Sequence, residues 1–294
     1  MTSETEANHK ENRKKKTILD LQAKKDGHVP ITMLTAYDFS SGQLVDRAGI
    51  DIVLVGDSLA MVMLGLDSTI PITMDEMLHH CRAVARGAKY AFLVGDMPFM
   101  SYQAEMGEAI RNAGLFLKEG MMESVKLEGG REIAGTIMAI VAAGIPVMGH
   151  IGLTPQSVSK LGGYKVQGKK AADAVRLLDD ALALEEAGCY AIVLEAVPAP
   201  IATVISKRLR IPTIGIGAGV GCDGQVLVYH DLVGLFDRFT PKFVKRYANI
   251  GPVIAEALSS FASDVEDGSF PAVEHTYEIP DEEYRSFLKL IEDR

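Results

Sequence analysis

The sequence is poor in aromatic residues and in cysteine. Of its 294 residues none is Trp and 6% are aromatic, whereas 48% are hydrophobic. This composition is typical of tightly layered parallel strands and argues against an aromatic-rich β-sandwich. The three cysteines, Cys81, Cys189 and Cys222, form neither a CxxC pair nor a zinc-ligand spacing. Scattered thiols of this kind are expected of a reduced, cytoplasmic protein.

The sequence also lacks an apolar run long enough to suggest a membrane span. The longest stretch, residues 138–153, is interrupted by Gly144, Pro146 and His150. Residues 1–30 are polar and carry both signs of charge, which is typical of neither a signal peptide nor a transit peptide. We therefore expect a cytoplasmic protein with no membrane partner.

The charge balance is acidic. A net charge of −9 and an isoelectric point near 5.3 disfavour nonspecific binding to nucleic acid. The one basic cluster, Arg13 to Lys16, opens a segment of mixed charge. We interpret it as part of a solvated N-terminal helix rather than as a nucleic-acid-binding arm, and we expect no nucleic-acid partner.

Strand-like and helix-like windows alternate along most of the chain. Eight short apolar windows predict strands, and segments with helical periodicity, such as residues 74–86 and 171–187, separate them. The predicted strands cover residues 31–36, 51–55, 91–95, 124–127, 146–149, 191–194, 212–215 and 225–229.

This alternation predicts an α/β fold with a parallel sheet. A closed (β/α)₈ TIM barrel is favoured over a doubly wound open sheet, because functional residues on strands two to six converge only if the sheet closes. We expect a single barrel domain over residues 28–270. A polar N-terminal segment covers residues 1–27, and a C-terminal tail covers residues 271–294.

Four predicted strands end on a carboxylate and a fifth ends on a histidine. Burying an ionised carboxylate at the tip of an apolar strand is unfavourable unless a cation, hydrogen bonds or proton chemistry compensates. Because ligands bind at the carboxyl ends of the strands in either fold, these side chains indicate one site. They are Asp57, Asp96, Glu128, Glu195 and His150.

Asp57, Asp96 and Glu128 are the candidate metal ligands. Hard divalent cations such as Mg²⁺ prefer oxygen ligands, and no cluster of His or Cys offers a site for a softer metal. The alternative is that each acid only caps the helix that follows it. That alternative explains Glu128 poorly, because Glu is a weak N-cap and Gly129-Gly130 beside it suggest close approach of a ligand.

Lys126, Glu195 and His150 are the candidates for charge and proton chemistry. Lys126 lies two residues before Glu128 and faces the same way in a strand, so it either neutralises an anionic substrate or pairs with a neighbouring acid. Glu195 ends a very apolar run and suits a general base, with a capping or salt-bridge role as the alternative. His150 suits a proton shuttle or a hydrogen-bond donor, although such a histidine is often structural. The glycine-rich residues 215–219 either cradle a phosphate or pack closely against neighbours.

Several longer segments resemble the ketopantoate hydroxymethyltransferase family. The pair GHIGLTPQSV and GGYKVQG is far more specific than a single glycine motif. Further matching segments are VLVGDSLAMVMLGLDSTIPITMDEM, LVGDMPFMSYQ, VKLEGG and IPTIGIGAGVGCDGQVLVYHDLVG. The resemblance runs from about residue 31 to about residue 270. Ala60 stands where the family's GDSLG turn has a glycine.

The resemblance implies a cytoplasmic, Mg²⁺-dependent (β/α)₈ enzyme of pantothenate biosynthesis. Such enzymes transfer a hydroxymethyl group from 5,10-methylenetetrahydrofolate to α-ketoisovalerate through a Mg-stabilised enolate, which gives ketopantoate, and they usually form homodecamers. The implied metal ligands are Asp57, Asp96 and Glu128; the implied ketoacid-binding residues are Asp57, Ser58, Asp96 and Lys126; the implied proton acceptor is Glu195; and His150 is an active-site residue of less certain role.

Two other functions compete with this one. A Mg²⁺-dependent lyase or mutase of the isocitrate lyase and phosphoenolpyruvate mutase type would share the fold and the acid-held metal. The GHIGLTPQSV–GGYKVQG segment and the absence of a KKCGH-type nucleophile loop disfavour it. A non-enzymatic scaffold or metabolite sensor would have no need for so many reactive side chains at strand ends.

Overall fold

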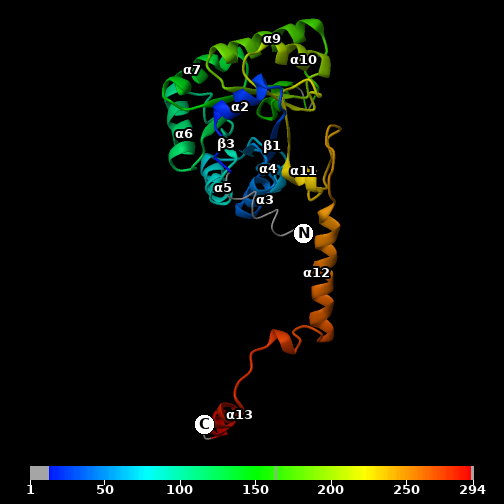
Figure 1. Ribbon diagram of the computed structural model, residues 1–294. Coiled ribbons are helices and arrows are strands. Elements are labelled where there is room, and N and C mark those ends of the chain that lie inside the picture. The colour runs from blue at the N-terminus through cyan, green and yellow to red at the C-terminus, as the bar shows by residue number, and fades with distance from the viewer. Residues whose placement is uncertain (1–12, 162, 164, 293–294) are drawn as a thin grey trace. The chain divides into compact units, whose positions relative to one another are not determined.

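The computed structural model describes residues 13–161, 163 and 165–292 (Figure 1). The chain divides into two compact units, of which the first ends at Arg246 and the second begins at Tyr247. The expected domain boundaries at residues 27 and 270 stay predictions. Large apolar side chains of residues 247–270, such as Leu258 and Phe261, are exposed. Of the predicted N-terminal segment, the first twelve residues lie outside the described ranges.

Eight parallel strands form a closed barrel in chain order, and the last strand pairs with the first. The strands are β1 (Ile31–Thr35), β2 (Ile52–Val55), β3 (Phe92–Asp96), β4 (Ser124–Glu128), β5 (Val147–Gly152), β6 (Ala191–Glu195), β7 (Thr213–Ile216) and β8 (Gly224–Leu227). The predicted (β/α)₈ barrel is therefore confirmed, with strand ends that differ from the predicted ones by at most three residues.

Helices join the strands and surround the barrel (Figure 1). In the first unit they are α2 (Ile18–Asp26), α3 (Phe39–Arg47), α4 (Leu59–Val62), α5 (Met74–Gly87), α6 (Met106–Lys118), η1 (Arg131–Ile133), α7 (Ala134–Ala142), η2 (Pro155–Ser157), α8 (Val158–Leu161), α9 (Ala171–Glu186), α10 (Ala199–Arg208) and α11 (Tyr229–Val233). The second unit contains α12 (Ile250–Asp267), η3 (Val273–His275) and α13 (Asp281–Glu292).

The predicted N-terminal helix is α2, but the basic cluster precedes it. Thr17 caps the helix in a reciprocal capping box with Asp20, and Leu21 packs into the apolar cluster inside the barrel. The preceding cations contact the barrel instead of water alone: Lys15 pairs with Glu123 at 2.8 Å, and Arg13 lies over the Tyr90 ring. These contacts account for the basic cluster as an attachment of the N-terminal segment to the barrel.

Alternation along the strands separates an inner core from an outer one. Side chains two residues apart, such as Ile52 and Leu54, point into the barrel, while Val53 and Val55 pack against the surrounding helices. The inner cluster consists of Leu21, Ile31, Met33, Ile52, Leu54, Phe92, Val94, Met148, Ala191, Val193, Ile214, Ile216 and Val226. The last inward positions of several strands are polar, and these carry the site.

Two glycines at strand ends allow the helices to approach closely. A Cβ atom at Gly95 would overlap the ring of Phe116 in α6, and one at Gly149 would lie 2.7 Å from Leu184 Cδ1 in α9. Each glycine faces outward, and the next residue, Asp96 or His150, faces inward. The Gly-Asp and Gly-His pairs therefore combine tight packing outside the barrel with a reactive group inside it.

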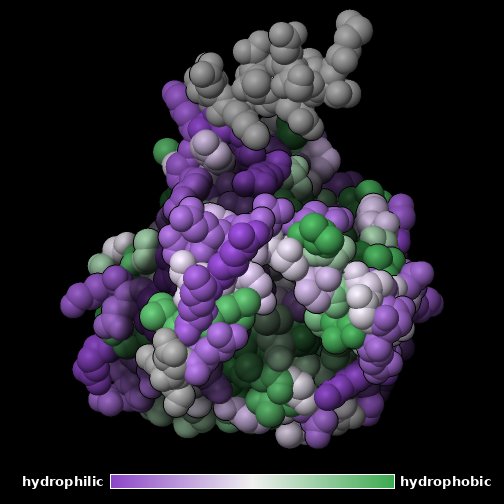
Figure 2. All heavy atoms as spheres, turned by 90° about the horizontal axis from the view of Figure 1, so that it is seen from below, coloured by the Kyte–Doolittle hydropathy of each residue, from purple (hydrophilic) through white to green (hydrophobic). Residues whose placement is uncertain are grey.

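Among the described residues, no helix is both long enough and apolar enough to cross a membrane. The face shown in Figure 2 mixes apolar side chains (green) with hydrophilic ones (purple).

Candidate functional site

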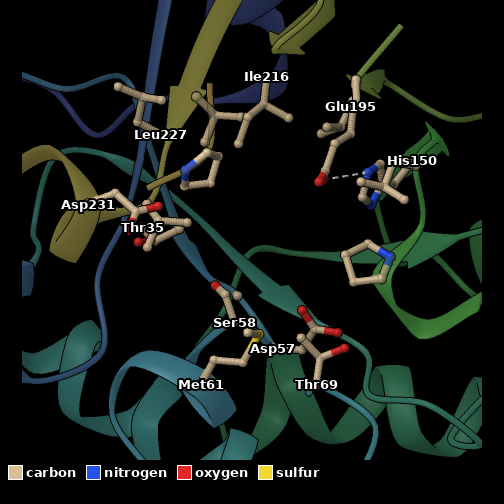
Figure 3. A pocket seen from close by; sticks show the side chains of 18 of the residues that line it. Thr35, Asp57, Ser58, Met61, Thr69, His150, Glu195, Ile216, Leu227 and Asp231 are labelled. Carbon is tan, nitrogen blue, oxygen red and sulfur yellow. Dashed lines mark ion pairs between the residues drawn. The ribbon is translucent and has the colours of Figure 1, made fainter. Parts of the chain in front are cut away.

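The predicted site residues surround one cavity of about 460 Å³ at the carboxyl ends of the strands. The cavity is lined by all seven of them, namely Asp57, Ser58, Asp96, Lys126, Glu128, His150 and Glu195. Parallel pairing sets their neighbours: Asp96 is in register with Lys126, and Glu128 is in register with His150. Figure 3 shows Asp57 and Ser58 on one side of the cavity and His150 and Glu195 on another.

The ammonium group of Lys126 lies among the carboxylates. Its Nζ is 2.8 Å from Asp96 Oδ1 and 3.8 Å from Glu128 Oε1, and both partners are buried. Burial opposes the charged form of Lys126, but Asp96, Glu128 and Asp57 outweigh it and raise the pKa of the ammonium group. Lys126 is therefore a fixed positive charge, and the ion-pair alternative for this residue is present in the structure.

His150 connects the acid cluster with Glu195. Its Nδ1 lies 3.2 Å from Glu128 Oε1, and its Nε2 lies 3.2 Å from Glu195 Oε2 (Figure 3). The Nε2 contact has ion-pair distance but not hydrogen-bond geometry. Burial and Lys126 lower the pKa of His150, whereas Glu128 and Glu195 raise it more, to about 9. The imidazole thus has a carboxylate on each side, and Lys126 Nζ lies 3.2 Å from its Nδ1.

Burial and neighbouring negative charges disfavour the ionised forms of Asp57 and Asp96. The Asp57 backbone N–H donates to Asp96 Oδ2 at 3.2 Å. Burial raises the pKa of Asp57 well above its usual value, and the charges of Asp96 and Glu128 add to the effect. Burial also raises the pKa of Asp96, although Lys126 opposes the increase. Glu128 differs, because His150 and Lys126 overcome burial and lower its pKa.

Two neutral residues that the sequence analysis did not select hold these acids in place. The side chain of Gln156 in η2 donates to Asp57 Oδ2 at 3.0 Å and to Met97 O at 2.9 Å, while its backbone N–H donates to Glu128 Oε2 at 3.0 Å. The Tyr102 hydroxyl lies 2.9 Å from Gln156 Oε1 and accepts from the Glu128 N–H at 3.1 Å. Both residues lie in segments that carried the family resemblance, and this was the only signal for them in the sequence.

Ser58 lies at the edge of the cavity beside a buried tyrosine. Its Oγ is 2.8 Å from the hydroxyl of Tyr37, whose pKa is raised because its ring is fully buried. This contact orients the serine hydroxyl, which leaves it one further hydrogen bond toward the cavity.

The carboxylates provide the oxygen ligands that a hard divalent cation prefers. Across the described ranges, no three His, Cys, Asp or Glu side chains already stand as a formed metal-ligand group. However, the four carboxylates of Asp57, Asp96, Glu128 and Glu195 outnumber the two basic side chains in contact with them, Lys126 and His150. A divalent cation would offset the excess negative charge and favour ionised Asp57 and Asp96, whose pKa values are raised. The metal-ligand assignment stays a prediction that the donor chemistry supports.

The glycine-rich turn at residues 215–219 follows β7. A Cβ atom at Gly217 would meet the ring of Phe243 at 2.8 Å, and one at Gly219 would overlap Ala199. Close packing therefore accounts for these glycines, which is the second of the two explanations that the sequence left open.

Comparison with known proteins assigns the family. A model of the family described as ketopantoate hydroxymethyltransferase matches residues 15–273. The chain belongs to the ketopantoate hydroxymethyltransferase family. A relative in Carboxydothermus hydrogenoformans named 3-methyl-2-oxobutanoate hydroxymethyltransferase is 56% identical over 266 residues, which is 90% of this chain and 96% of the relative. One of the same name in Nitratidesulfovibrio vulgaris (strain DP4) is 53% identical over 278 residues, or 95% of this chain and 90% of the relative.

Membership in the ketopantoate hydroxymethyltransferase family confirms the predicted enzyme class, a transferase. Solved structures resemble the chain in fold alone. A crystal structure of phosphonopyruvate hydrolase has a TM-score of 0.59 at 15% identity and covers 95% of this chain and 99% of that one. A second structure of that name, in complex with oxalate and Mg²⁺, has a TM-score of 0.57 at 15% identity. A crystal structure of 2,3-dimethylmalate lyase, described as a member of the PEP mutase/isocitrate lyase superfamily, has a TM-score of 0.56 at 15% identity and covers 89% of this chain and 92% of that one, which again is a likeness of fold.

Proposed function

We propose that this enzyme transfers a hydroxymethyl group from 5,10-methylenetetrahydrofolate to α-ketoisovalerate and so makes ketopantoate in the first committed step of pantothenate biosynthesis. The observation that carries the proposal is the order of charges around the cavity. Three buried acids surround Lys126, and His150 links this cluster to Glu195. This arrangement suits a reaction in which a carboxylate removes a proton from a carbon of the substrate. The negative charge that then develops on a substrate oxygen would lie near the ammonium group of Lys126.

Asp57, Asp96 and Glu128 would hold Mg²⁺, which, when bound, supplies a Lewis acid for the carboxylate and keto oxygens of the ketoacid. Asp57, Ser58, Asp96 and Lys126 border the same part of the cavity and would contact the ketoacid. Gln156 and Tyr102 keep the acids from turning away, so the ketoacid would meet a prepared surface.

Glu195 would accept the proton from C3 of the ketoacid. Its side chain is 16% exposed, so it reaches the cavity while His150 contacts its other side. Removal of the proton gives an enolate, and the fixed charge of Lys126 would offset the negative charge that accumulates on the oxygen. The enolate carbon would then attack the methylene carbon of the folate, so that a new carbon–carbon bond forms as one carbon–nitrogen bond to the folate breaks. Water would replace the second nitrogen, which supplies the hydroxyl group of ketopantoate and releases tetrahydrofolate.

Exchange of deuterium from C3 of α-ketoisovalerate tests the proposal. We expect exchange that needs Mg²⁺ but not the folate, followed by formation of ketopantoate when methylenetetrahydrofolate is added. Glu195→Gln should abolish exchange; exchange at the wild-type rate in this variant would exclude Glu195 as the base. Asp96→Asn should weaken Mg²⁺ binding in a calorimetric titration, and an unchanged affinity would contradict the metal-ligand role.

The proposal extends to the state of the enzyme in the cell. A cytoplasmic homodecamer is the expected form, by analogy with the family. Sedimentation velocity at micromolar concentration would give the mass directly, and a stable monomer would refute the decamer.

A further inference from the structure

The cavity has two chemically different halves. The side formed by β2 to β6 carries the charged residues described above. The side formed by β7, β8 and the segment after α11 is mostly apolar and aromatic, with Lys242 as its cationic residue; its apolar members are Ile216, Leu227, Phe236, Phe239 and Phe243. A ketoacid that binds at the charged half would leave this second half for another part of the reaction.

One carboxylate, that of Asp231 in α11, lies in the apolar half. Asp231 lines the cavity and is only 9% exposed. Figure 3 shows it across the cavity from Glu195 and His150. Within the described part of the chain, no side-chain or backbone donor forms a hydrogen bond with its carboxylate, and the positive charge of Arg246 acts on it without one. Its oxygens therefore accept hydrogen bonds from water in the cavity or from a bound ligand.

The surroundings of Asp231 restrict what that ligand is. The rings of Phe236 and Phe239 pack edge to face with their centroids 5.7 Å apart. Phe243 rests on Gly217, where a side chain would displace it. Arg246 donates to Thr240 Oγ1 at 2.6 Å, which secures this segment. A planar ring that stacks on such apolar walls and presents N–H donors on one edge satisfies both the walls and the carboxylate.

We infer that Asp231 and the aromatic wall form the subsite for the pterin ring of the one-carbon donor, with the Asp231 carboxylate accepting from the ring N3–H and the 2-amino group. This inference rests on the proposed function and adds the location of the folate. The two donors on one edge of the pterin match the two oxygens of a carboxylate.

Binding of tetrahydrofolate, which lacks the transferable carbon, tests the subsite without turnover. Asp231→Asn should raise the dissociation constant about tenfold to a hundredfold, the range expected when a charged acceptor of two hydrogen bonds becomes a poorer one. Asp237→Asn is the matched control, because Asp237 is an exposed carboxylate six residues away that does not line the cavity. It should bind tetrahydrofolate as the wild type does.

A second experiment changes the ligand instead of the protein, so the wild-type result does not depend on how well a variant folds. A tetrahydrofolate analogue with a methyl group in place of the 2-amino group should bind wild type about tenfold or more weakly than tetrahydrofolate. Asp231→Asn should discriminate between the two ligands much less. Equal binding of both ligands by wild type, or equal discrimination by wild type and Asp231→Asn, would overturn the assignment.

The readouts separate this inference from the proposed function. Deuterium exchange from α-ketoisovalerate reports the charged half alone. Exchange and transfer in wild type, together with unchanged tetrahydrofolate affinity in Asp231→Asn, would refute the subsite and leave the proposed function intact. Failure of wild type to exchange or to bind tetrahydrofolate would refute both. A parallel loss of exchange and affinity in Asp231→Asn would show a structural role and would also refute the subsite.

Discussion

The side-chain amide of Gln156 bridges Asp57 Oδ2 and the carbonyl oxygen of Met97, at 3.0 and 2.9 Å. It joins the ends of β2 and β3 through a residue that follows β5. The acids of the site therefore depend on a neutral side chain from a different part of the barrel.

Gln156→Ala should weaken Mg²⁺ binding about tenfold to a hundredfold, because groups that orient metal ligands commonly contribute that much. Titration of the variant with Mg²⁺ by calorimetry gives the affinity. Gln103→Ala is the control, since Gln103 is exposed and contacts Gln156 only at 3.4 Å. An affinity for Mg²⁺ within twofold of wild type in Gln156→Ala would show that Asp57 is held by other groups.

Tyr102→Phe should lower the free energy of unfolding by about 1–3 kcal/mol, because the change leaves the buried Glu128 N–H without its acceptor. Denaturation by urea measures the difference. Tyr277→Phe is the matched control, since Tyr277 is fully exposed and its hydroxyl contacts water. Equal stability of Tyr102→Phe and wild type would mean that another group takes over the hydrogen bond.

Gly95→Ala should destabilise the barrel by about 1–3 kcal/mol, since the added methyl group overlaps the Phe116 ring in a packed core. Gly114→Ala, in α6 itself, should instead stabilise by about 0.5–1 kcal/mol, because no described atom lies within 4 Å of the new methyl group and alanine favours helix. Thermal unfolding of both variants provides the comparison. The same sign of change in both would contradict the packing argument.

Asp231 should make stability depend on pH in a defined direction. Burial raises its pKa from 3.8 to about 6, with Arg246 opposing, so the folded chain binds this proton more tightly than the unfolded chain. The carboxylate therefore lowers the free energy of unfolding as pH rises from about 4 to above 6. Asp231→Asn should then stabilise at pH 8 by on the order of 1 kcal/mol, a value reduced for the water in the cavity, and less at pH 4.5.

Urea denaturation at the two pH values measures this difference, with Asp237→Asn as the control. A stabilisation in Asp231→Asn that is the same at both pH values would show that the charge of Asp231 has no part in it.

The residues that could be predicted from the sequence are those whose positions follow from strand periodicity. Asp96 and Glu195 each end an apolar run, so their inward direction follows from alternation, and pairing between neighbouring strands then brings His150 to Glu128. Gln156 and Tyr102 lie in loops whose paths no periodicity determines. They are neutral and 54 residues apart, and only folding shows that they meet.

Asp231 was missed because no apolar strand ends on it. It lies in α11, shortly after β8, and no periodic pattern of apolar residues in the sequence singles out this position.

The division of the cavity between two groups of strands bears on how such a protein can change. The charged half comes from β2 to β6, whereas the apolar half comes from β7, β8 and the segment up to Arg246. Substitutions in one half leave the strands of the other untouched. A new carbon donor could thus be selected, in the laboratory or in natural divergence, by altering one contiguous stretch of the chain, while the machinery that removes the proton is inherited unchanged.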